Sequence, residues 1–222
     1  MAEKLVEKGV GQDRVSVIRN WVDLSHIFPL EGVSPYRAEL GFSGEDFVVL
    51  YSGNIGAKQG LGVLLDAAEK LRDERGIKFV VAGEGPVKND LQAKYAQLEN
   101  VRFLPFQPYS RLNEFLNMAD LHALPQDKGA ADLVLPSKLG GMLASGKQVL
   151  VTAEKGTELA EFVDNIGLVV EPGDAGAMAE AILHCAKQGE LPSGSREEAL
   201  GRLSREAGLK EIVSAVAPAC HA

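Results

Sequence analysis

The stretch LPSKLGGMLASG, residues 135–146, places a lysine and two adjacent glycines at the start of a predicted helix. A glycine inside a helix costs roughly 1 kcal/mol relative to alanine, so Gly140 and Gly141 need an explanation. Lys138 is also unusual there, because the helix dipole disfavours a cation in the first turn unless an anion binds at the same end. We therefore expect an anion site, with the glycines letting a ligand approach the helix backbone. The alternative is a solvated surface lysine.

Two glycine-rich loops follow predicted strands elsewhere in the chain, GNIGAKQG at 53–60 and GEGP at 83–86. Small residues before a helix expose backbone N–H groups to an anion, which favours a phosphorylated small molecule as ligand. Such loops equally often make tight turns, and both interpretations stay open. The first loop matches neither G-x-G-x-x-G nor the P-loop pattern. The candidate ligand residues in the two loops are Gly53, Asn54, Gly56, Lys58, Gly83 and Gly85.

Short apolar runs alternate with helical patterns along most of the chain, and these elements must position the loops. Six runs read as strands, within residues 46–53, 77–86, 100–106, 120–125, 147–153 and 166–174. Because strands that are buried on both faces and joined by helices form parallel sheets, we predict a Rossmann-like, doubly wound α/β domain over residues 45–190, with about six strands flanked by helices. Ligands bind beyond the carboxyl ends of such strands, where the glycine-rich loops fall.

The two ends of the chain lie outside this alternating series. The N-terminus reads as an amphipathic helix ended by Gly9, and residues 13–28 as one further strand and a loop. Residues 191–195 read as a turn, and a single helix is predicted after them. We divide the chain into a Rossmann-like domain, residues 1–190, and a C-terminal helical tail, residues 191–222.

Composition argues against several classes of protein. The chain of 222 residues carries 23 basic and 31 acidic side chains, a formal charge of −8, which disfavours a nucleic-acid binder. Its two cysteines form no C-x-x-C pair, which disfavours zinc or dithiol chemistry and fits a reducing cytosol. There is neither a signal-peptide core nor an apolar run of about 18 residues, so we expect a cytoplasmic protein.

Few side chains are candidates for catalysis. The sequence has no G-x-S-x-G motif and no D-x-D metal motif, and its histidines are scattered. His122, inside a predicted strand, is expected to be a hydrogen-bonded core or strand-end residue. Several carboxylates fall near the predicted ligand edge, namely Glu84, Asp132, Glu154, Glu158 and Asp174, and Glu158 opens a helix there. We assign no catalytic residue and expect no metal.

Six segments, in this order, resemble the C-terminal half of GT-B glycosyltransferases. They are VSVIRNWVD, YSGNIGAKQGLGVLLDAAEKL, FVVAGEGPVKNDL, VRFLPFQPYSRLNEFLNMADLHALP, LPSKLGGMLASGKQVLVTA and GTELAEFV…GLVVEPGD. The resemblance covers residues 13 to about 188 and points to retaining bacterial transferases of exopolysaccharide and O-antigen assembly, the colanic-acid type of family 4. No single motif is unique, so the order of the segments carries the resemblance.

The resemblance implies a domain that binds the donor, a UDP- or GDP-linked sugar, with no cofactor or metal. The acceptor would bind the N-terminal domain of a longer parent protein, and residues 1–12 resemble the helix that precedes the donor half. We therefore expect this chain to be an excised donor domain that binds nucleotide and is inactive alone. The parent is expected in the cytoplasm or at the cytoplasmic face of the inner membrane.

The resemblance also implies roles for individual residues. Ser137, Lys138 and the N–H groups of Leu139, Gly140 and Gly141 would hold phosphate. Backbone groups of Phe106 and Gln107 would read the base. The chain departs from the family at Gly141, which replaces the glutamate that normally holds the ribose hydroxyls, and Glu158 could contact the ribose instead. Asn54 and Gln59 stand where many relatives have phosphate-binding cations, which leaves Lys58 as the nearest cation in that loop.

Other functions remain open at this point. A GT-B sugar epimerase would share the fold. A pseudo-transferase domain that serves only assembly is compatible with the missing glutamate. An NAD-binding module would need G-x-G-x-x-G, and a response regulator would need acidic residues after the first strand, so both fit less well.

Overall fold

The computed structural model describes residues 2–128, 135–189 and 196–216. They form a six-stranded parallel sheet with strand order β3-β2-β1-β4-β5-β6. The strands are β1 Phe47–Ser52, β2 Ile77–Ala82, β3 Val101–Leu104, β4 Leu121–Leu124, β5 Gln148–Thr152 and β6 Leu168–Val170. The predicted Rossmann-like sheet is confirmed. Its order reverses between β1 and β4, and ligands of such sheets bind at this switch point.

The central strands are mostly apolar because helices cover both faces of the sheet. In β1, Val49 and Tyr51 belong to the hydrophobic cluster on one face, whereas Val48 and Leu50 belong to the cluster on the other. This alternation follows from the two-residue period of a strand. It explains why the sequence shows continuous apolar runs rather than alternating ones.

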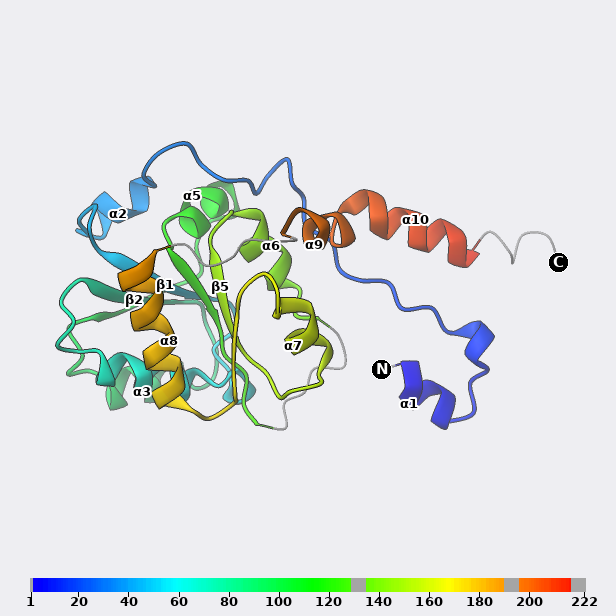
Figure 1. Cartoon of the computed structure of the whole chain (residues 1–222), viewed down its shortest axis with the longest axis horizontal. Helices are drawn as coiled ribbons and strands as arrows, with labels where there is room; N and C mark the ends of the chain where they lie inside the picture. Colours follow the sequence, from blue (N-terminus) through cyan, green and yellow to red (C-terminus); the bar gives the residue numbers. More distant parts are fainter. Residues whose placement is uncertain (1, 129–134, 190–195, 217–222) are drawn as a thin grey trace.

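The helices form a layer on each side of the sheet (Figure 1). The first layer consists of α3 Leu61–Lys70, α4 Lys88–Lys94 and α8 Ala175–Gln188. The second consists of α2 Pro35–Glu39, α5 Leu112–Asn117, α6 Lys138–Ala144 and α7 Glu158–Val163. Two 3-10 helices, η2 Ala57–Gln59 and η3 Tyr109–Arg111, follow β1 and β3. The candidate ligand loops therefore lie at the carboxyl edge of the sheet, between the layers.

Residues 15–28, here called the entry segment, connect the N-terminal part of the chain to the sheet domain. The strand predicted within residues 13–28 is wrong, because this range contains part of the 3-10 helix η1 Gln12–Arg14 and an isolated bridge between Val22 and Ser204. Val22 donates its N–H to the carbonyl of Leu203 at 2.9 Å, and Phe28 donates to Oδ1 of Asn113 at 3.0 Å. The entry segment thus lies against helices rather than along a sheet edge.

Two side chains of the entry segment pack closely against glycines. A Cβ atom at Gly140 of α6 would lie 3.1 Å from Cβ of Val22, and one at Gly208 would lie 2.6 Å from the ring of Trp21. Val22 itself is buried. The entry segment is therefore seated on both helices through close contacts that a larger residue would obstruct.

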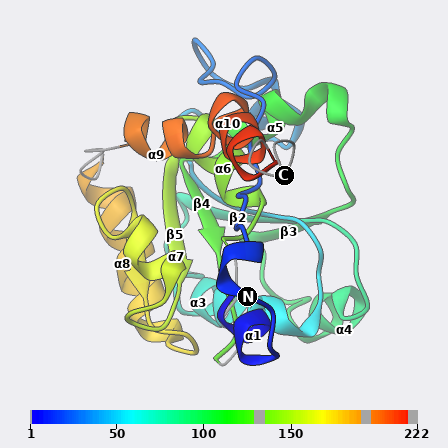
Figure 2. The same cartoon turned by 90° about the vertical axis from the view of Figure 1, so that its right-hand side faces the viewer.

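The C-terminal part differs from the predicted single helix. It forms α9 Arg196–Arg202 and α10 Arg205–Val216, separated at Ser204. The hydroxyl of Ser204 accepts the N–H of Ala207 at 3.1 Å, as an N-cap does. Ala199 of α9 joins the hydrophobic cluster of α6 and α7, whereas α10 projects from the same side of the molecule as α1 Ala2–Glu7 (Figures 1 and 2). The predicted turn at 191–195 includes only residues outside the described ranges.

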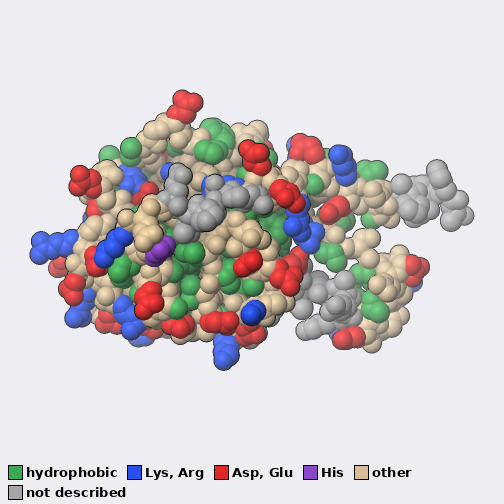
Figure 3. All heavy atoms as spheres, in the orientation of Figure 1, with side chains coloured by type: hydrophobic (Ala, Val, Ile, Leu, Met, Phe, Trp, Pro, Cys, Tyr) green, Lys and Arg blue, Asp and Glu red, His purple; other side chains and the backbone are tan. Residues whose placement is uncertain are grey.

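Acidic and basic side chains are interspersed over the face that the space-filling view presents (Figure 3). Together with the formal charge of −8, this mixed surface gives no support to a nucleic-acid interface on that face.

Candidate functional site

The loops after β1 and β2 pack against each other backbone to backbone. Gly53 donates its N–H to Ala82 at 2.9 Å, and Ile55 donates to Glu84 at 2.8 Å. A Cβ atom at Gly83 would lie 1.8 Å from the carbonyl oxygen of Gly53, and one at Gly85 would lie 2.1 Å from that of Ile55. Gly83 and Gly85 therefore have a packing role that does not depend on a ligand.

Lys138 and Gly53, both predicted to bind phosphate, lie together at the carboxyl end of β1. The amine of Lys138 is 4.0 Å from the centre of the Tyr51 ring, and a Cβ atom at Gly53 would lie 3.3 Å from the same amine. Tyr51 is fully buried and donates its hydroxyl to the carbonyl of Asn54, and its burial raises its pKa. The neutral Tyr51 ring therefore makes a cation–π contact with the ammonium of Lys138. Because Gly53 has no side chain, space remains beside this ammonium.

The remainder of the first loop is tied to the loop after β4. Lys58 is exposed, and its carbonyl accepts the N–H of Asp127 at 3.2 Å. A Cβ atom at Gly56 would meet the side chains of Gln59 and Asn54, at 2.5 and 3.0 Å. The structure thus gathers Asn54 and Gln59 around Gly56, whereas the phosphate role of Lys58 stays a prediction.

The start of α6 differs in part from the predicted phosphate site. Leu139 donates its N–H to the carbonyl of Pro136 at 3.0 Å and buries its side chain, which argues against its predicted role as a phosphate donor. Val22 fills the space beside the Cβ position of Gly140, which argues against room for a ligand on that side, and the phosphate role of Gly140 stays a prediction. Ser137 makes no capping hydrogen bond through its side chain.

Gly141 faces different surroundings from Gly140. A Cβ atom at Gly141 would lie 3.4 Å from a methyl group of Leu116, an ordinary contact. Gly141 also lines a cavity of about 270 Å³ between α5, α6, the end of β1 and the entry segment. The polar and aromatic residues around this cavity include Asp23, His26, Ser52, Tyr109, Ser137 and Lys138. Gly141 thus lines the larger cavity.

Glu158, the predicted ribose contact, lines a different and smaller cavity of about 70 Å³ beside Ser137 and Gly140. It begins α7 after the N-cap Thr157, and its carboxylate pairs with Arg19 of the entry segment at 2.8 Å. Its partner in the described structure is therefore an arginine, and the ribose role of Glu158 stays a prediction.

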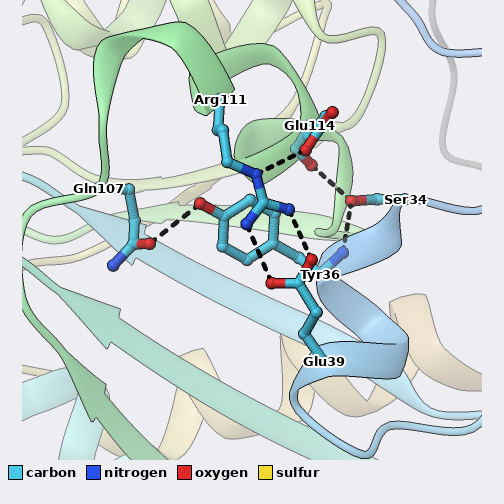
Figure 4. Close-up of polar contacts among 6 residues, drawn as sticks. All are labelled: Ser34, Tyr36, Glu39, Gln107, Arg111 and Glu114. Atoms are coloured by element: carbon cyan, nitrogen blue, oxygen red, sulfur yellow. Dashed lines mark hydrogen bonds and ion pairs between the residues drawn. The ribbon is translucent and has the colours of Figure 1, made fainter.

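The loop after β3 carries the two predicted base contacts. Phe106 is 57% exposed. Both ends of the Gln107 side chain form hydrogen bonds. Its Oε1 accepts the hydroxyl of Tyr36 at 3.0 Å (Figure 4). Its Nε2 donates to the carbonyl of Pro105 at 2.9 Å. This leaves backbone groups for the predicted contact with a base.

A cluster of charged residues supports that loop from α2 and α5. The guanidinium of Arg111 lies 4.1 Å from the centre of the Tyr36 ring and pairs with Glu39 at 2.6 Å and Glu114 at 2.9 Å (Figure 4). Desolvation raises the pKa of Tyr36, so its hydroxyl stays protonated and donates to Gln107. The cluster fixes one side of the predicted base loop.

His122 is a core residue, as predicted, and lies fully buried with its Nε2 3.0 Å from the hydroxyl of Ser145. Burial lowers its pKa to about 3, with the charges of Lys147 and Arg196 adding to the shift. Asp132, one of the carboxylates near the predicted ligand edge, lies outside the described residues. Within the described ranges, no group of three or more His, Cys, Asp and Glu side chains could hold a metal ion.

Sequence reasoning missed the polar and aromatic residues that the entry segment contributes to the larger cavity, Trp21, Asp23 and His26. It also missed Tyr109, whose ring stacks on His26 with centroids 4.1 Å apart and an interplanar angle of 12°. The one available signal was that VSVIRNWVD formed part of the resembling series, which did not assign a role to Asp23.

The doubly wound parallel sheet, with a lysine and a cavity at its switch point, is a Rossmann-like domain. The family model "Glycosyl transferases group 1" matches residues 33–202, so the chain belongs to the group 1 glycosyltransferase family. Its resemblance to GT-B glycosyltransferases is thereby confirmed.

Two curated relatives and one solved structure illustrate the relationship. The chain is 36% identical to the putative colanic acid biosynthesis glycosyl transferase WcaI of Escherichia coli (strain K12), over 96% of this chain and 54% of that protein. It is 28% identical to the probable glycosyltransferase WbjE of Pseudomonas aeruginosa, over 81% of this chain and 46% of that protein. The Anabaena protein HepE, solved with UDP-glucose, has a TM-score of 0.82 and 18% identity, over 98% of this chain and 61% of that one. The chain spans about half the length of the curated relatives it matches.

Within the described ranges, no helix is long and apolar enough to cross a membrane.

Proposed function

We propose that this chain is the donor-binding part of a retaining glycosyltransferase. The parent protein would move a sugar from a UDP- or GDP-sugar to a saccharide or lipid-linked acceptor in cell-surface polysaccharide synthesis. The observation that carries the proposal is the position of the Lys138 amine, beside Gly53 at the carboxyl end of β1. The similarity to WcaI and to HepE with UDP-glucose supports the same assignment.

The chemistry demanded of this half is stabilisation of the leaving diphosphate. Breaking the bond between the sugar and the diphosphate places negative charge on the phosphate oxygens, and a fixed cation lowers the energy of that state. Lys138 meets this demand, because the buried Tyr51 ring holds its ammonium in place. Acceptor-side groups, including any general base, would come from the rest of the parent protein.

The proposed partners follow from this division of labour. The donor is a nucleotide sugar, and the acceptor binds an N-terminal domain of the same parent chain. This fragment is expected to bind nucleotide without transferring sugar. The parent would act in the cytoplasm or at the cytoplasmic face of the inner membrane.

Isothermal titration calorimetry with UDP, GDP and their sugars tests the donor site directly. We expect at least one of these ligands to bind, and the same ligand to bind Lys138→Ala more weakly. If none of these ligands binds, the donor-site proposal is contradicted.

A further inference from the structure

The cavity of about 270 Å³ has one wall that the sequence did not assign to any site, the entry segment. This wall is held in a defined conformation. Oδ1 of Asp23 accepts the backbone N–H and the hydroxyl of Ser25 at 2.9 and 2.6 Å, and the carbonyl of Asp23 accepts the N–H groups of His26 and Ile27. Ile27 is buried. Asp23 and His26 are thus positioned before a ligand arrives.

His26 continues this wall onto the loop after β3. Its ring stacks on Tyr109, and its Nε2 lies 3.0 Å from the carbonyl oxygen of Tyr109. Two stacked rings present a flat, partly apolar surface, which suits a planar heterocycle. Tyr109 is also close in sequence to Phe106 and Gln107, the residues predicted to lie beside the base.

Three kinds of chemistry therefore surround one cavity: an ammonium from Lys138, a carboxylate from Asp23 and the stacked rings of His26 and Tyr109. A carboxylate accepts hydrogen bonds and would repel phosphate, so it suits hydroxyl groups. Sites for whole small molecules measure about 300–1,000 Å³, so this cavity suits the nucleoside part of a nucleotide sugar rather than the whole molecule. Gly141 adds room on the helix side, because it has no side chain.

We propose that the nucleoside of the donor occupies this cavity, with the ribose hydroxyls donating to the carboxylate of Asp23 and the base lying against the His26–Tyr109 rings. The inference rests on the proposed function and deepens it. It assigns ribose binding to the entry segment, with Glu158 paired instead to Arg19 on the smaller cavity.

The test compares the affinities of the whole chain for UDP, 2′,3′-dideoxy-UDP and inorganic pyrophosphate, measured by calorimetry. If GDP binds better than UDP, then GDP and 2′,3′-dideoxy-GDP replace the two uridine ligands. The wild-type protein is expected to bind UDP about tenfold or more tightly than the dideoxy form, since hydrogen bonds to a charged group are strong. In Asp23→Asn this ratio should fall towards one while pyrophosphate affinity is unchanged. Asp73→Asn, an exposed position far along the chain, is the matched control and should keep the wild-type ratio.

Gly141→Leu gives an independent check that does not alter the carboxylate. Leucine favours a helix, so the fold is expected to survive, and a thermal melt verifies it. The side chain would enter the cavity and remove most of the affinity difference between UDP and pyrophosphate. The proposal is overturned if UDP binds and the hydroxyl-dependent ratio survives in Asp23→Asn, or if that ratio is lost in Glu158→Gln instead. If no nucleotide binds the wild type, the proposed function itself fails, and this inference with it.

Discussion

The ammonium of Lys138 lies 4.0 Å from the centre of the Tyr51 ring, which joins the first turn of α6 to the end of β1. Tyr51 belongs to the hydrophobic core and also anchors the start of the first loop through the carbonyl of Asn54. The Lys138 ammonium, the candidate group for binding phosphate, is therefore positioned by a residue of the core rather than by a surface loop.

Lys138→Ala should weaken the binding of UDP much more than that of uridine, because the ammonium meets the diphosphate and not the nucleoside. Loss of a charge-assisted contact of about 1.5–3 kcal/mol corresponds to a decrease in affinity of roughly tenfold to a hundredfold. Calorimetry with both ligands measures the difference. Lys187→Ala, at an exposed position on α8, serves as the control. Equal losses for UDP and uridine would contradict the role of Lys138.

Tyr51→Phe removes the hydroxyl that donates to Asn54 and keeps the ring under Lys138. We expect the free energy of unfolding to decrease by about 0.5–1.5 kcal/mol, the usual net value of one hydrogen bond. Urea denaturation measures it. Tyr109→Phe is the comparison, since Tyr109 is exposed, and should change stability by less than about 0.5 kcal/mol. A Tyr51→Phe protein as stable as the wild type would show that the loop needs no such anchor.

Gly83→Ala should be among the most destabilising single changes outside the core. Its Cβ atom would overlap the carbonyl oxygen of Gly53, which is backbone and cannot rotate away. We expect a loss above about 2 kcal/mol, or failure to fold. Gly62→Ala is the control, because it lies in α3 with nothing near its Cβ position and should stabilise the protein by about 0.5–1 kcal/mol. Similar melting temperatures for the two variants would refute the close packing of the loops.

His122 should make the protein sensitive to acid. Its pKa is lowered to about 3 in the folded state, mainly by burial, from a value near 6.5 in the unfolded chain. The unfolded state therefore binds the proton more readily, so this contribution to stability is complete above pH 6.5 and is lost as the pH falls from 6.5 towards 3. The slope attributable to one proton is about 1.4 kcal/mol per pH unit.

The measurement for His122 is the free energy of unfolding against pH, for the wild type and for His122→Asn. The variant is expected to be less stable at pH 8, because a buried hydrogen bond changes, and to lose less stability between pH 6.5 and 4. Parallel curves over that interval would show that His122 is not the group that responds.

The fold could be predicted because the information is local. The run FVVLY is hydrophobic at every position, and a helical pattern follows it, which is sufficient to indicate a buried parallel strand. The failure at residues 13–28 has an equally physical reason. An extended apolar segment has the composition of a strand whether its neighbour is a sheet edge or a helix layer, and contacts with Leu203 and Asn113 decided the outcome.

The candidate site was less predictable because its walls come from distant parts of the chain. Gly140 and Gly141 are adjacent and identical in sequence, yet one contacts Val22 and the other lines the cavity. Nothing local distinguishes them. Lys138 could be predicted because a cation is disfavoured in the first turn of a helix. Asp23, in contrast, lies in a loop, where an aspartate is common.

The contacts of Trp21 with Gly208 and of Val22 with Gly140 have a consequence for how the described chain is held together. Residues 2–14 precede this pair of contacts in the chain, and Gly208 lies in α10, so the two ends of the described chain meet here. Val22 lies against Gly140 of α6, and the same helix carries Lys138 two residues earlier. The helix that receives Val22 therefore also carries the candidate phosphate-binding ammonium.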